Sequence, residues 1–75
     1  MSKADEMFEK LGYEKFQHGN VGYIRKDNEG RLNGVIFFLN KKSIGVHYTE
    51  VETIGITMQE LQAINEKVKE LGWNE

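Results

Sequence analysis

The sequence feature that most constrains the fold is the segment 31–40, which reads as a strand that is apolar on both sides. Its two alternating sets of side chains are Val35, Phe37 and Leu39 on one side, and Leu32, Ile36 and Phe38 on the other. Strands in an antiparallel sheet with one wet face normally alternate apolar and polar residues, and this segment does not. We therefore expect a central strand whose two faces are both covered.

Three further segments with a period of two and many β-branched or aromatic residues read as strands, at 13–17, 21–26 and 43–48. Short turn-forming stretches separate them, which favours antiparallel neighbours. The alternation predicts one almost wholly apolar face made of Val21, Tyr23, Val35, Phe37, Leu39, Ile44, Val46 and Tyr48. It predicts a mixed opposite face made of Gly22, Ile24, Leu32, Gly34, Ile36, Phe38, Gly45 and His47.

The C-terminal segment carries the signals of an amphipathic helix. Thr57 and Glu60 are spaced as a capping box at its start, and Gly72 is placed to end it in a left-handed conformation. Apolar residues recur every three or four positions, at Met58, Leu61, Ile64, Val68 and Leu71. We expect this stripe to cover the apolar face of the sheet.

A shorter helix is predicted at the N-terminus, capped by Ser2 and stopped by Gly12. A helix of this length is marginal alone, so it must dock. We expect Met7, Phe8 and Leu11 to cover the second face of the sheet. If they do not, that face is a binding surface, most simply for a homodimer. The candidate interaction residues on it are Ile24, Leu32, Ile36 and Phe38.

Together these elements predict an α+β fold: a short N-terminal helix, an antiparallel meander of three to four strands, and a long C-terminal helix on one face. The length of 75 residues allows a single small domain, residues 1–75. The chain has no cysteine, no signal-peptide core and no apolar run long enough to span a membrane. These features favour a cytoplasmic protein without a membrane partner.

No group of residues predicts an enzyme. His47, Glu50 and Glu52 are the one close set of metal-ligand types, but a metal needs three or four converging ligands. Alternation in a strand would point His47 and Glu50 to opposite faces. No serine has a predicted base beside it, and no glycine-rich segment leads into a helix as a phosphate loop does. We expect no catalytic activity, no cofactor and no bound metal.

The formal net charge is −2, yet the middle of the chain is basic. Its five basic residues are Arg25, Lys26, Arg31, Lys41 and Lys42. With aromatic residues between them, they permit weak binding of single-stranded nucleic acid. Most of those aromatic residues are needed for the core, however, so we do not expect nucleic acid to be the main partner. We expect an accessory interaction module that acts through a protein partner or self-association, with weak nucleic-acid binding by segment 25–42 as the alternative.

Three short motifs lie at the two ends of the chain: Leu11-Gly12-Tyr13, the stretch ITMQELQAIN at 56–65, and Glu70-Leu71-Gly72-Trp73. In these motifs the chain resembles a family of small uncharacterised phage-type proteins, encoded by prophages of Gram-positive bacteria. The resemblance implies a compact α-β-α unit carried by mobile genetic material. It implies no activity and assigns no functional residue.

The capping box gives a first test. Thr57→Ala removes the hydroxyl that caps the C-terminal helix, and we expect the free energy of unfolding to fall by roughly 0.5–2 kcal/mol. Urea denaturation followed by circular dichroism measures this loss. An unchanged midpoint would contradict the predicted helix start.

Overall fold

The computed structural model describes residues 2–26, 30–48 and 56–73. The helices and strands follow the order α1 (Lys3–Lys10), β1 (Glu14–His18), β2 (Asn20–Lys26), β3 (Leu32–Phe38), β4 (Ser43–Tyr48) and α2 (Met58–Glu70). The four strands form one antiparallel sheet in the order β1-β2-β3-β4. The expected α+β fold is confirmed, and β3 is a central strand as its apolar sides predict.

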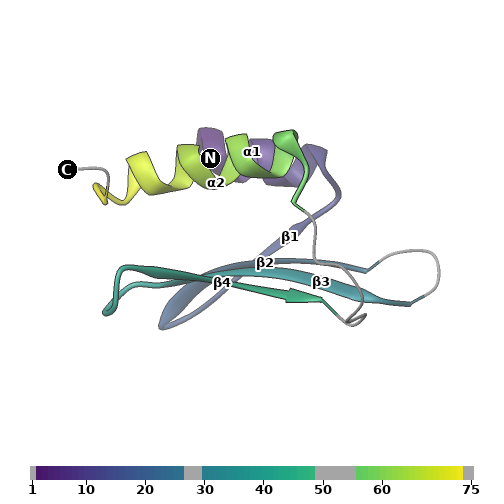
Figure 1. Cartoon of the computed structure of the whole chain (residues 1–75), viewed down its shortest axis with the longest axis horizontal. Helices are drawn as coiled ribbons and strands as arrows, with labels where there is room; N and C mark the ends of the chain where they lie inside the picture. Colours follow the sequence, from purple (N-terminus) through teal and green to yellow (C-terminus); the bar gives the residue numbers. More distant parts are fainter. Residues whose placement is uncertain (1, 27–29, 49–55, 74–75) are drawn as a thin grey trace.

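The strand register places side chains on the two faces of the sheet as the sequence alternation predicts. On one face, Val35 lies between Tyr23 of β2 and Val46 of β4. On the other, Ile36 lies between Gly22 and Gly45. Both helices lie over the first of these faces (Figure 1). We call it the inner face, and we call the opposite one the outer face.

The position of α1 differs from our expectation, because it lies beside α2 and not on the outer face. Phe8 is fully buried and stacks on the inner-face ring of Tyr23, with ring centroids 3.9 Å apart. Met7 and Leu11 pack against the same core. The reason is the width of the sheet. Four strands spaced about 4.8 Å apart form a face roughly twice as wide as one helix can cover. The inner face therefore accommodates both helices side by side.

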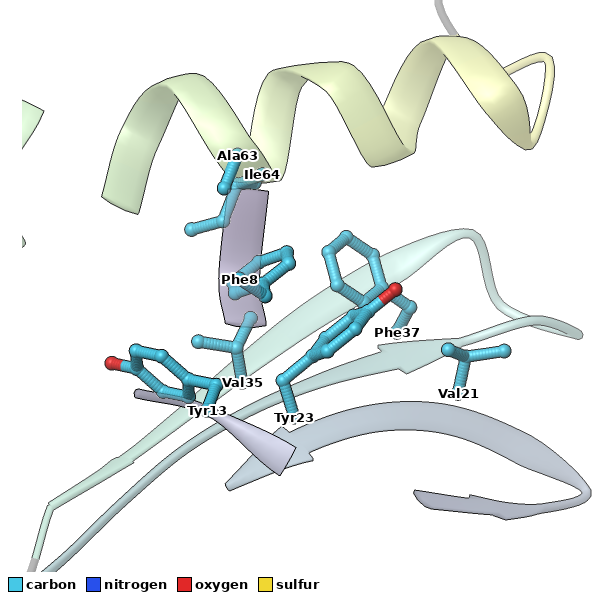
Figure 2. Packing of buried hydrophobic residues seen from close by; sticks show 8 residues of the cluster. All are labelled: Phe8, Tyr13, Val21, Tyr23, Val35, Phe37, Ala63 and Ile64. Carbon is cyan, nitrogen blue, oxygen red and sulfur yellow. The ribbon is translucent and has the colours of Figure 1, made fainter. Parts of the chain in front are cut away.

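The core lies between this pair of helices and the sheet. Its side chains from the sheet point toward the helices, as Figure 2 shows. The buried cluster consists of Phe8, Tyr13, Val21, Tyr23, Val35, Phe37, Ala63 and Ile64. Phe8 meets Tyr13 and Phe37 edge-on, with centroids 5.5 and 6.4 Å away. Edge-to-face pairs and offset stacks are the favoured aromatic geometries, so one ring of α1 organises the cluster.

The two ends of α2 are as predicted. The side chains of Thr57 and Glu60 each accept a hydrogen bond from the other residue's backbone amide, which completes the capping box. At the other end Gly72 has a φ of 74°, and the amide of Trp73 donates to the carbonyl of Val68 over 3.0 Å. This is the Schellman arrangement that a terminal glycine favours.

The buried side of α2 matches the predicted stripe only in part. Ile64 is buried, and Val68 and Leu71 pack against the core as predicted. Met58 is 66% exposed and Leu61 is exposed as well, whereas Glu60, Ala63 and Lys67 are buried. The helix is rotated because α1 lies along one flank, so its buried arc is shared between α1 and the sheet. Glu60 and Lys67 can be buried because each has a partner. Glu60 contacts Arg25 and accepts a hydrogen bond from Tyr13, and Lys67 contacts Asp5.

This rotation can be tested by comparing two truncations. Phe8→Ala removes a fully buried ring and is expected to lower the free energy of unfolding by about 3–5 kcal/mol. Met58→Ala removes an exposed side chain and is expected to change it by less than about 0.5 kcal/mol. Urea denaturation of both variants measures the difference. A loss of stability of similar size in Met58→Ala would show that Met58 is buried, as the predicted apolar stripe requires.

Candidate interaction surface

A polar cluster centred on Asp5 joins α1, α2 and the sheet. The hydroxyl of Tyr23 donates to Asp5 Oδ1 over 2.5 Å, and Lys15 Nζ donates to Asp5 Oδ2 over 2.9 Å. The buried ammonium of Lys67, from α2, lies 3.8 Å from Oδ1. α2 also reaches α1 directly, because Glu70 Oε2 accepts the amide of Ala4 over 2.9 Å. The Asp5 carboxylate of α1 thus connects both helices with the sheet.

A second cluster is centred on Glu60 at the start of α2. Besides capping the helix, Glu60 accepts a hydrogen bond from the hydroxyl of Tyr13, and Arg25 lies 3.6 Å from its Oε2 atom. The guanidinium of Arg25 sits 4.8 Å from the ring centroid of Tyr13 and donates to the carbonyl of Leu11 over 3.1 Å. The cluster therefore fixes the α1–β1 connection against α2.

These contacts change the proton affinities of their members. Burial raises the pKa of Asp5, but hydrogen bonds from Tyr23 and Lys15 outweigh it and hold the pKa at about 2, below the ordinary 3.8. Burial and the bond to Asp5 both raise the pKa of Tyr23 far above its usual range. Burial also raises the pKa of Glu60, yet the bonds from Tyr13 and Thr57 leave it lowered.

Both clusters serve to hold the structure together. A hollow of about 390 Å³ beside the first is lined by Asp5, Glu9, Tyr13, Glu14, Lys15 and Tyr23. The carboxylates of Asp5 and Glu60 already accept hydrogen bonds from other residues of the chain. In the described residues, every buried polar side-chain atom has a partner. The apolar stripe predicted for α2 does not include Glu60 and Lys67, although both are buried. Residues 60, 63, 64 and 67 are spaced by three, one and three positions, so they lie on one side of a helix. This spacing could have indicated that Glu60 and Lys67 share the buried side with Ala63 and Ile64.

The outer face carries an apolar surface shaped by glycines. The Phe16 ring lies across Gly22, where a Cβ atom would overlap it, and the Phe38 ring lies across Gly45, where a Cβ atom would come within 2.9 Å. Alternation along the strands placed Gly22, Phe38 and Gly45 on one face, but it did not include Phe16 and could not show that the two rings cover the glycines. The rings are thereby held in defined positions.

The residues that the sequence nominated for interaction do lie together on this face. Ile24 and Leu32 are 36% and 37% exposed, and Ile36 and Phe38 are half-buried. We call Phe16, Ile24, Leu32, Ile36 and Phe38 the outer apolar patch. In the described part of the chain both helices lie on the opposite side of the sheet (Figure 1).

The basic residues do not form one surface. Arg25 points to the inner face and is engaged with Glu60 and Leu11. Lys26 is at the end of β2, next to Arg31, whereas Lys41 and Lys42 occupy the turn between β3 and β4. The length of β3, roughly 20 Å at 3.3 Å per residue, separates the two ends. A nucleic acid would have to span the sheet to contact both.

The residues considered for metal binding are also separated or undescribed. His47 is exposed on the outer face of β4, opposite Gly34, while Glu50 and Glu52 lie outside the described residues. Within residues 2–26, 30–48 and 56–73, no three His, Cys, Asp or Glu side chains gather as a metal site would require. Neither described helix has the length and apolar character needed to cross a membrane.

The Asp5 cluster makes stability depend on pH. Because the folded-state pKa of about 2 is below the ordinary 3.8, the contribution is complete above pH 3.8 and lost as the pH falls toward 2. We expect Asp5→Asn to lower the free energy of unfolding at pH 7 by about 2 kcal/mol and to flatten its fall below pH 4. The matched control, Glu6→Gln, changes an exposed neighbour on α1 and should keep the wild-type profile, as measured by urea denaturation at each pH.

The resemblance to phage-type proteins stays a prediction. Comparison of the chain with protein-family models, with curated proteins and with solved structures found no match.

Proposed function

We propose that this chain is a non-enzymatic accessory module that binds a protein partner through the outer apolar patch. The observation that carries the proposal is the placement of both helices on the inner face, which leaves Ile24 and Leu32 of the outer face more than one-third exposed. Apolar patches that stay exposed on a folded surface commonly mark protein interaction sites.

The chemistry of the patch favours a partner with an uncharged, apolar surface. Ile36 lies at its middle, flanked by Gly22 and Gly45, and the charged Glu14 and Lys26 lie toward one end of the sheet. An apolar centre with a polar margin is the usual composition of a protein interface. Because the rings of Phe16 and Phe38 are already set across glycines, binding would cost little side-chain entropy.

The dimensions of the patch favour modest affinity. Strands of five to seven residues, four across, cover roughly 20 by 20 Å, which gives about 400 Å² of flat surface per partner. Stable complexes typically bury about 800 Å² on each partner, and transient ones bury less. We therefore propose a transient complex that forms and dissociates.

Nucleic-acid binding is the weaker alternative. Its five basic residues lie at two ends of the sheet, and Arg25 already has partners within the fold. If it occurred, affinity would fall steeply as salt rises, because phosphate contacts release counterions. Binding to an apolar protein surface changes much less with salt.

The test uses affinity purification from the native cell, followed by titration of the purified partner. Ile24→Lys puts a charge in the outer apolar patch, and we expect it to lose the partner or bind it at least tenfold more weakly. The control, Met58→Lys, puts the same charge on an exposed apolar site of α2 and should bind like the wild type. A partner retained by Ile24→Lys but lost by Met58→Lys would overturn the proposal.

A further inference from the structure

The two edges of the sheet are protected very differently. β1 carries Glu14 and Lys15 along its five residues, and Lys15 is paired with Asp5 of α1. Among the described strands β4 pairs only with β3, and its six residues, SIGVHY, include no aspartate, glutamate, lysine, arginine or proline. Charged or proline residues are the usual means by which proteins prevent an edge strand from pairing with another chain. β4 has none of them.

Apolar side chains flank the unprotected edge on its inner side. Ile44 of β4 is 39% exposed although it lies on the face that the helices cover. Leu61 of α2 is nine residues from Glu70, so at 100° per residue the two point in opposite directions. Glu70 contacts α1, and Leu61 therefore lies on the flank of α2 that faces away from α1. Figure 1 shows this flank on the same side of the molecule as β4.

We propose that β4 pairs in antiparallel fashion with β4 of a second copy of this chain, so that the two sheets continue into one. An antiparallel pair of identical strands is related by a two-fold axis, which makes the edge complementary to itself. With the axis at Gly45, Ile44 would lie opposite Val46 of the second copy, on the side of the helices. Two uncharged edges meet without repulsion.

The difference between the β1 and β4 edges also favours a closed dimer over an open chain of many copies. Pairing of β4 with β1 of another molecule would leave free edges and build a fibre. The charges of Glu14 and Lys15, and the α1 contact through Lys15, act against that pairing. Pairing of β4 with β4 uses up both unprotected edges, and the assembly closes as a dimer. It also brings two outer apolar patches into one continuous surface, although the pairing itself does not require that patch.

A matched pair of substitutions tests the proposal by sedimentation equilibrium. The wild type should sediment with twice the monomer mass at micromolar concentration. Ile44→Lys places a lysine at the proposed seam in each copy, and we expect at least a tenfold weaker dimer with an unchanged circular dichroism spectrum. Ile24→Lys makes the same change at a similarly exposed site on the outer face, 36% against 39%, and should remain dimeric.

The outcomes separate this proposal from the proposed function. A monomeric wild type overturns the dimer and leaves the proposed function of the outer apolar patch untouched. A dimer lost in Ile24→Lys but kept in Ile44→Lys also overturns the β4 pairing, because it places the contact between copies on the outer apolar patch. Should Ile44→Lys fail to fold, isotope-filtered NMR on a mixture of labelled and unlabelled wild type decides. Contacts between β4 protons of different molecules support the pairing, and a dimer without them excludes it.

Discussion

The stack of Phe8 on Tyr23 is the contact on which the rest of the structure depends. It places α1 on the inner face, where the hydroxyl of the same tyrosine also binds Asp5 of that helix. One residue of the sheet thus holds α1 by its ring and by its oxygen. With α1 fixed there, α2 shares the inner face and turns its buried side partly toward α1, and the outer face receives no helix from the described chain.

This arrangement explains why charged residues lie in the core of so small a protein. Glu60 and Lys67 are on the side of α2 that faces both α1 and the sheet, and each is neutralised or hydrogen-bonded there. Isolated buried charges are costly, whereas paired ones can be tolerated and fix geometry. The two clusters act as positioning contacts that set how the helices sit against each other, a task that short apolar side chains perform with less precision.

The uncovered surfaces follow from the same cause. Two helices side by side cover much of the inner face, so Ile24 and Leu32 stay accessible on the outer face and Ile44 stays accessible at the β4 edge. A domain of this size buries a smaller share of its surface than a larger domain does, and it commonly gains stability from a partner or a second subunit. The outer apolar patch and the β4 edge are two places where this chain can bury more surface.

The sequence by itself determined the elements, because they follow from local rules. The capping box at Thr57, the glycine stop at Gly72 and the period of two in the strands depend on neighbours within a few residues. The division of side chains between the two faces also followed, since short turns fix the register. Only the tertiary structure decided which face α1 covers and that the buried side of α2 includes Glu60 and Lys67 in place of Met58 and Leu61. Those choices rest on the width of the sheet and on long-range partners such as Asp5 with Tyr23, which no local pattern encodes.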